Sequence, residues 1–303
     1  MTFQDIIDQV LGYAKSIGKT PSFHDVKAWA NEGYRTALMG GPTAHRWTFL
    51  TPTATFTAWP TTTGTLSTAV ESGGSTTITA TTAVFYPSMI GHDIKFTQNS
   101  YTITAYTSST VVVVSGDAEA ETGTFTIIAD GVYRLPDDYD GMASGFTYSP
   151  STTSGLVRVA QRPAQWLREC MAGTTATGYP NYFAVEPVAL DSTAGQRHNV
   201  LFYPIPGAVS VLNYAYSVDP SELSLDAGYI YGGAAFAQLV MMAALAIAEK
   251  RLTQTIGVNA VEYKEALVGA IARDVSKRPR YAGSLAQEAI PFERRTNVTY
   301  ITD

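Results

Sequence analysis

The sequence predicts an α+β protein with three parts: a helical-bundle core with antiparallel strands, an inserted small β-barrel or β-sandwich domain, and an extended C-terminal arm. Three observations predict this class. Apolar residues recur at helical spacing near both ends of the chain, residues 51–130 are rich in threonine, and residues 276–303 show no sustained periodicity. With 303 residues, 45% of them hydrophobic and 15% charged, the chain is long enough to bury a core of its own.

The first 40 residues predict a hairpin of two short helices. Apolar residues at helical spacing between Phe3 and Ala14 give one face of a first helix, which ends near Gly18. Ser22 is placed to cap a second helix, which ends before Gly40.

Residues 51–130 predict a separate all-β domain. They contain 22 threonines and a single basic residue, Lys95. Short runs alternate between apolar and polar residues and are separated by glycine-, asparagine- or aspartate-containing turns: residues 76–79, 94–96, 101–104, 111–114 and 125–127. Period-two patterning with regular turns is typical of a small antiparallel barrel or sandwich.

The chain after residue 131 predicts more strands and then two helices. Residues 182–185 and 200–203 are predicted to pair, with residues 209–216 as the next strand and a short helix at 165–170. Helices are predicted at about 233–252 and 259–275, the first of them apolar almost all round and therefore buried. The predicted domains are a discontinuous core (1–50 and 131–275), an insertion (51–130) and an arm (276–303).

No contact with a membrane is expected. The longest apolar run, residues 234–248, is shorter than the roughly 18–20 residues that span a bilayer. The first twelve residues alternate acidic and apolar side chains and lack the basic and apolar regions of an ordinary signal peptide.

The basic residues concentrate near the C-terminal end of the chain. Six of the 20 fall within 23 positions: Arg273, Lys277, Arg278, Arg280, Arg294 and Arg295. The net charge of −6 argues against a protein that coats nucleic acid along its whole surface. The basic segment has three interpretations: contact with passing DNA, contact with an acidic groove of a partner protein, or a solvated terminus.

Motifs for catalysis, cofactors or metals are not predicted. Gly18-Lys19-Thr20 follows a helix rather than a strand, so we interpret it as a helix C-cap and not a phosphate loop. Cys170 is the single cysteine, and the four histidines are scattered along the chain: His24, His45, His92 and His198. The acidic turn after Pro136, with Asp137, Asp138 and Asp140, lacks the glutamate of a calcium loop. Hydrolysis of a polysaccharide needs two carboxylates across a cleft. Three carboxylates are candidates for that role, but no sequence pattern pairs any two of them: Glu169, Glu186 and Asp191.

Several segments in order resemble the head–tail adaptor, or connector, proteins of tailed bacteriophages. Residues 26–35 followed by 47–50 resemble their opening helical hairpin, and residues 133–139 resemble the segment that re-enters their core after a variable insertion. Residues 179–183, 201–206 and 212–216 resemble their strand pattern. Residues 85–96 resemble small β-modules of virion proteins.

This resemblance implies a non-enzymatic structural protein of the virion, made in the host bacterial cytoplasm and placed at the head–tail junction. It implies a homo-oligomeric ring of twelve copies below the portal protein, which also contacts tail or nozzle proteins. Helices of the ring would line the channel, with transient contact to passing DNA, and no cofactor is implied. The arm would clasp the portal through basic and aromatic residues: Lys277, Arg278, Arg280, Phe292, Arg294, Arg295 and Tyr300.

Two alternatives remain at this point. A virion-associated cell-wall hydrolase would need a cleft that holds a carboxylic acid with a raised pKa. A glycan-binding module would use the inserted domain and present aromatic platforms, for which the candidates are Trp59, Tyr86, Tyr101 and Tyr106.

Overall fold

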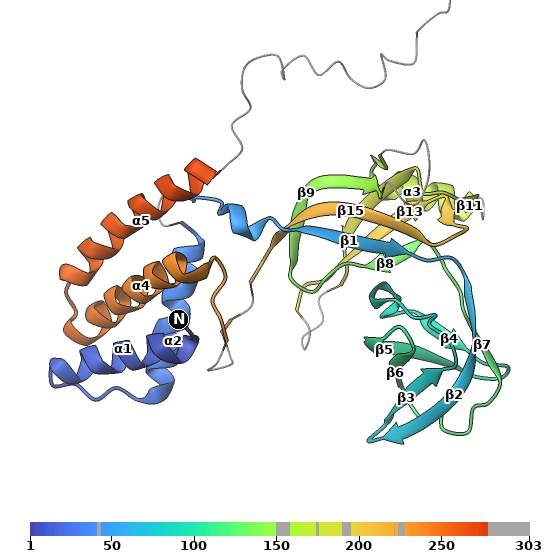
Figure 1. Ribbon diagram of the computed structural model, residues 1–303, viewed down its shortest axis with the longest axis horizontal. Helices are drawn as coiled ribbons and strands as arrows, with labels where there is room; N and C mark the ends of the chain where they lie inside the picture. Colours follow the sequence, from blue (N-terminus) through green and yellow to red (C-terminus); the bar gives the residue numbers. More distant parts are fainter. Residues whose placement is uncertain are drawn as a thin grey trace, which may run out of the picture. The chain divides into compact units, whose positions relative to one another are not determined.

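A computed structural model of the chain divides into two compact units (Figure 1). The helical unit contains residues 1–49 and the chain from residue 222 onward, and the β unit contains residues 50–221. The structure describes residues 1–40, 44–149, 158–173, 176–189, 195–220, 222–223 and 228–277.

The described part of the helical unit contains four α-helices: α1 (Phe3–Ser16), α2 (Phe23–Leu38), α4 (Gly233–Thr253) and α5 (Val258–Lys277). Three of them were predicted from the spacing of apolar residues, and α4 from its continuous apolar run. Helix α4 packs against the other three and lies between α5 and the α1–α2 pair (Figure 1). By length and composition alone α4 could also cross a membrane, but a core helix of a soluble protein has the same character, and α4 buries its apolar residues within the unit.

Local side chains set the ends of the first two helices. Thr2 and Asp5 form a capping box at the start of α1, and the Ser22 hydroxyl accepts a 3.1 Å hydrogen bond from the backbone N–H of Asp25 at the start of α2. Gly18 has φ +71° just after α1, which confirms the interpretation of that glycine as part of a helix C-cap.

Helices α2 and α4 approach closely at Gly33. A Cβ atom at this position would lie 2.6 Å from the backbone nitrogen of Ala244, so no side chain fits there. A glycine on one helix and an alanine on the other let the two backbones meet.

Outside residues 60–130, the described part of the β unit contains two larger sheets and one two-stranded sheet. The first is antiparallel in the order β1-β15-β9, with bounds β1 (Thr53–Ala58), β15 (Ser210–Val218) and β9 (Tyr139–Tyr148). The second has the order β10-β12-β13-β8, with β10 parallel to β12 and the other pairs antiparallel: β10 (Ala160–Gln161), β12 (Tyr182–Pro187), β13 (His198–Tyr203) and β8 (Val132–Arg134). Helix α3 (Ala164–Gly173) packs on β12 and β13, and β11 (Thr177–Gly178) pairs with β14 (Ile205–Pro206).

Aromatic rings join the two sheets. The Phe56 ring of β1 lies 5.7 Å from the Phe202 ring of β13, and the Phe146 ring of β9 lies 5.1 Å from the same Phe202. Tyr133 of β8 and Tyr214 of β15 complete this buried cluster. The sheets therefore share one core.

The predicted pairing of residues 182–185 with 200–203 is confirmed, with Phe183 opposite Phe202 in the β12–β13 ladder. The next predicted strand, β15, does not extend that sheet. It pairs with β1 and β9 in the other sheet, where Tyr214 buries its ring against Phe56 and Phe146.

Six strands between β1 and β8 close into a barrel in the order β2-β3-β6-β5-β4-β7: β2 (Thr62–Ser72), β3 (Ser75–Ala80), β4 (Asp93–Lys95), β5 (Ser100–Ser108), β6 (Val111–Ser115) and β7 (Thr124–Ile127). Alternate residues point inward and are buried, among them Ile78, Ile103 and Val112. A short 3₁₀ helix, η3 (Pro87–Met89), lies between β3 and β4, and η2 (Thr48–Leu50) precedes β1. Of the two predicted forms, barrel or sandwich, the barrel is the one that forms.

The predicted α+β class is correct, but the predicted helical-bundle core is wrong. Strand and helix are nearly equal, at 35% and 34% of the described residues, and the described part of the β unit contains a closed barrel and three sheets. The predicted core strands belong to the β unit, where their aromatic faces bury one another between the two larger sheets. Whether residues 51–130 form an independent insertion, as the predicted domain division requires, stays a prediction.

Candidate functional site

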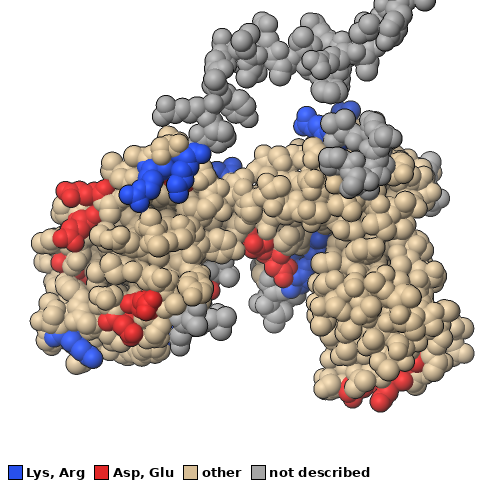
Figure 2. Space-filling model, in the orientation of Figure 1, with Lys and Arg blue, Asp and Glu red and all other residues tan. Residues whose placement is uncertain are grey.

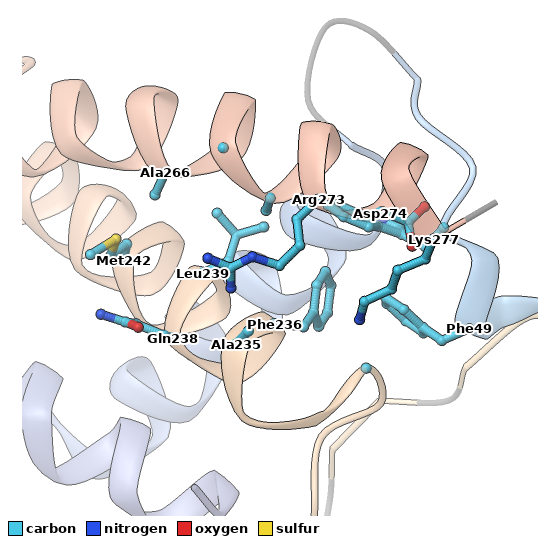
Figure 3. Close-up of a pocket in the computed structure, with 14 residues that line it drawn as sticks. Phe49, Ala235, Phe236, Gln238, Leu239, Met242, Ala266, Arg273, Asp274 and Lys277 are labelled. Carbon is cyan, nitrogen blue, oxygen red and sulfur yellow. The ribbon is translucent and has the colours of Figure 1, made fainter.

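The described part of the helical unit has a pocket of about 280 Å³ between α4 and α5 (Figure 3). Small and apolar side chains of both helices line it, together with two aromatic residues that follow α2. The lining residues are Trp47, Phe49, Gly232, Ala235, Phe236, Gln238, Leu239, Met242, Ala266, Gly269, Ala270, Arg273, Asp274 and Lys277.

Trp47 fixes the aromatic wall of the pocket. Its indole N–H donates to the carbonyl oxygens of Ala37 (3.0 Å) and Leu38 (3.1 Å), which are among the carbonyls that the end of α2 leaves without a helical partner. Its ring stacks on Phe49 at 5.7 Å and meets the edge of Phe236 at 5.0 Å. The end of α2 thereby holds the aromatic side chains against the start of α4.

Asp274 joins the last turns of α5 to the same segment. Its buried carboxylate accepts a 2.6 Å hydrogen bond from the Thr48 hydroxyl, further hydrogen bonds from the Thr48 backbone N–H, and a 2.9 Å contact from Nε2 of His45. Burial alone would raise the pKa of Asp274, but the hydrogen bonds from Thr48 and His45 outweigh it and lower that pKa. Asp274 is therefore an ionised, positioned carboxylate.

Arg273 and Lys277 supply positive charge at the pocket. Both side chains are exposed; Arg273 reaches from α5 toward Leu239 of α4, and Lys277 reaches toward Phe49 (Figure 3). Basic side chains gather over this end of α5 on the surface of the molecule (Figure 2). Cations in the last turns of a helix also oppose its negative end, which favours the helix. The pocket is thus an apolar hollow with a cationic edge.

Of the seven predicted arm residues, the structure describes only Lys277. It is the last residue of α5 and lies at the pocket. The other six lie outside the described residues: Arg278, Arg280, Phe292, Arg294, Arg295 and Tyr300. The aromatic wall was not predicted as a site, although Trp47 and Phe49 belong to a segment that carried the family resemblance.

Two of the three carboxylates named as hydrolase candidates are hydrogen-bonded to neighbouring side chains. Glu186 accepts hydrogen bonds of 2.6 and 3.0 Å from the guanidinium of Arg168, and Glu169 accepts one from Gln165. Asp191 lies outside the described residues. Across the described chain, no three His, Cys, Asp or Glu side chains cluster as metal ligands would.

The acidic turn at residues 137–140 is also held by protein contacts. Asp137 forms ion pairs with Arg134 and Arg197, and Asp138 accepts a 3.1 Å hydrogen bond from the Tyr216 hydroxyl. The turn is therefore part of the structural hydrogen-bond network of the β unit.

Among the predicted glycan-platform residues, Trp59 is fully buried and cannot form a surface platform. Tyr86, Tyr101 and Tyr106 are half-buried, and the Tyr101 hydroxyl donates to Glu121 at 3.0 Å.

Comparison with known proteins places the chain in a family. No curated protein matches the sequence. The family model for the SU10 adaptor protein matches residues 104–288, which is more than half of the 303 residues and includes the second half of β5, β6–β15, α4, α5 and the pocket residues from Gly232 onward. The chain therefore belongs to the SU10 adaptor protein family, which confirms the predicted resemblance to the head–tail adaptors of phages.

Proposed function

We propose that this phage structural adaptor forms a ring of twelve copies below the portal protein and lines part of the DNA channel at the head–tail junction. The family match over residues 104–288 carries this proposal. The ring, the portal position and the number of copies follow from the resemblance of the sequence motifs to head–tail adaptors.

The chain from residue 276 onward is proposed as the portal-binding arm, with Lys277, Arg278, Arg280, Phe292, Arg294, Arg295 and Tyr300 as its contact residues. The geometry of α5 supports this role. The Asp274 hydrogen bonds to Thr48 and His45 tie the last turns of α5 to the rest of the helical unit. An arm that leaves a rigid helix loses less entropy on binding than one that leaves a loop.

The role proposed for the family is mechanical, so no step of chemistry is assigned to the chain. The β unit, with its barrel, is proposed to contact tail or nozzle proteins, and the basic residues of the arm to contact DNA transiently as it passes. Repetition of weak basic contacts around a ring would strengthen both interactions.

Negative-stain imaging of the purified chain, alone and mixed with portal rings of the phage that encodes it, tests the proposal. We expect rings, or density added coaxially to the portal. Truncation after Lys277 keeps α5 and the pocket intact and is expected to abolish portal binding without lowering the unfolding temperature. Monomers that ignore the portal would reject the adaptor role, and unchanged portal binding after truncation would reject only the role of the arm.

A further inference from the structure

The first half of α5 exposes Glu262, Lys264 and Glu265, whereas its last turns expose the cations Arg273 and Lys277 at the pocket. Just before α5 and in its first turn, three large apolar side chains are exposed to solvent: Ile256 (76%), Val258 (68%) and Val261 (53%). Exposed Glu262 and Glu265 follow directly on α5. We call these five residues the tip patch. A contiguous group of exposed apolar residues bordered by charge is typical of an interaction surface.

The turn that bears the tip patch is held in place. The buried Glu249 carboxylate of α4 accepts a 3.1 Å hydrogen bond from the backbone N–H of Asn259, and Thr253 donates to the Glu249 carbonyl oxygen at 2.7 Å. The first contact satisfies a backbone N–H at the start of α5, and the second a carbonyl oxygen at the end of α4. The tip patch is therefore presented by an ordered turn.

The pocket lies toward the other end of α5 and has complementary properties. It is apolar inside, with walls that include Phe49, Phe236 and Leu239, and its edge carries the exposed cations Arg273 and Lys277 (Figures 2 and 3). A helix rises about 1.5 Å per residue, so Val258 of the tip patch and Arg273 at the edge of the pocket are about 20 Å apart along α5. A chain cannot place its own tip patch in its own pocket.

We propose that the tip patch of one copy of this chain docks into the α4–α5 pocket of the next copy. The apolar side chains around Val258 enter the hollow, and Glu262 and Glu265 face Arg273 and Lys277 of the neighbour. The pocket volume of about 280 Å³ lies just below the roughly 300–1,000 Å³ of small-molecule sites, which suits one or two aliphatic side chains better than a cofactor.

The inference rests on the proposed ring and names the contact that would build it. Two unlike surfaces of one chain form a heterologous contact, which repeats from copy to copy and generates a ring when the rotation closes. A contact of the tip patch with itself would stop at a dimer. Opposite charges at the edge select the tip-to-pocket pairing over tip-to-tip and pocket-to-pocket pairings.

A charge-swap experiment tests the contact. One chain carries Glu262→Arg and Glu265→Arg in the tip patch, and a second carries Arg273→Glu and Lys277→Glu at the pocket. Self-association of each, of the wild type and of the equimolar mixture is measured by mass photometry, alone and on portal rings. Each variant alone is expected to associate about tenfold or more less than the wild type, because like charges then meet. The mixture is expected to regain association, with the two chains alternating, because both of its contacts again join opposite charges.

A second pair of variants tests the apolar part. Val261→Asp is expected to weaken self-association, whereas Val70→Asp in the barrel, at a valine that is 58% exposed, is expected to leave it unchanged. Equal unfolding temperatures of all variants and the wild type show that the folds are intact.

The outcomes separate the contact from the ring. If the wild type forms rings and either charge variant alone associates equally well, the proposed contact is wrong and the ring stands. If the mixture fails to associate although each variant alone is monomeric, the pairing of these charges is wrong. If the wild type never associates, alone or on the portal, the ring and the contact are both rejected.

Discussion

The Thr48 hydroxyl donates a 2.6 Å hydrogen bond to the carboxylate of Asp274, a residue 226 positions later in the chain. This bond ties the segment after α2 to the last turns of α5. It also holds the aromatic wall of the pocket opposite its cationic edge, because Trp47 and Phe49 flank Thr48 and Arg273 precedes Asp274. The N-terminal and C-terminal parts of the helical unit are thus joined at the candidate site.

Replacement of Asp274 by alanine is expected to destabilise the helical unit by about 1–3 kcal/mol, because the Thr48 N–H and hydroxyl and the His45 ring would lose their acceptor in a buried position. Urea unfolding followed by tryptophan fluorescence measures this, since Trp47 lies beside the bond. Asp8→Ala removes an exposed carboxylate from α1 and is expected to change stability by no more than about 0.5 kcal/mol. Equal effects of the two changes would contradict the structural role of Asp274.

The lowered pKa of Asp274 predicts that the stability of the helical unit decreases in acid. The pKa of Asp274 is lower in the folded chain than in the unfolded chain, so ionisation favours the folded state. Its contribution is present above the unfolded value, about 3.9, and is lost as the pH falls through the lower folded value. The stability difference between the wild type and Asp274→Ala should therefore be constant from neutral pH to about 5 and shrink in stronger acid. A difference that persists unchanged below pH 2 would show that the charge of Asp274 is not what stabilises the unit.

His92 predicts a second pH effect, in the β unit. Its ring lies 4.8 Å from the Trp59 ring and 5.9 Å from the Tyr133 ring, and burial lowers the pKa of His92, although Asp130 at 3.8 Å and Asp93 act in the opposite direction. The folded state therefore binds a proton at His92 less readily than the unfolded state. The contribution of neutral His92 to the stability of the β unit should be fully present above about pH 6.5 and should fall as the pH drops below that value.

Thermal unfolding of wild type and His92→Gln between pH 7.5 and 5 measures this effect. We expect a smaller loss of unfolding temperature in the variant over that range. His24→Gln, at an exposed position in α2, is the control and should follow the wild type. A wild-type and a His92→Gln curve that fall in parallel would reject the assignment.

The local part of this fold could be predicted from sequence, and the non-local part could not. Helical spacing and the cap at Ser22 place α1 and α2, and the paired strands β12 and β13 are close neighbours in the sequence. The pairing of β1 with β15 joins residues such as Phe56 and Leu212, which no local pattern connects. The helical-bundle core was inferred from the helices alone, without the aromatic contacts that hold the two sheets together.

The candidate site shows the same limit. Lys277 was predicted because basic residues cluster near it, and charge can be counted along a sequence. The pocket depends on three segments, around Trp47, Phe236 and Arg273, that meet only after α4 and α5 have packed. Asp274 was not singled out, since a carboxylate among basic residues gives no sign that Thr48 will be its partner.

Two glycines in helices predict opposite effects of the same substitution. Gly33 of α2 faces the backbone of Ala244, where a Cβ would lie 2.6 Å from nitrogen, whereas a Cβ at Gly12 of α1 would meet nothing within 4 Å. Alanine at Gly12 should stabilise the chain by about 0.5–1 kcal/mol, because alanine restricts the unfolded chain and favours a helix. Alanine at Gly33 should destabilise it by about 1–3 kcal/mol, because α2 and α4 must separate or distort. Urea midpoints of both variants measure the two signs, and a Gly33→Ala chain as stable as the wild type would show that α2 and α4 do not pack backbone to backbone at this point.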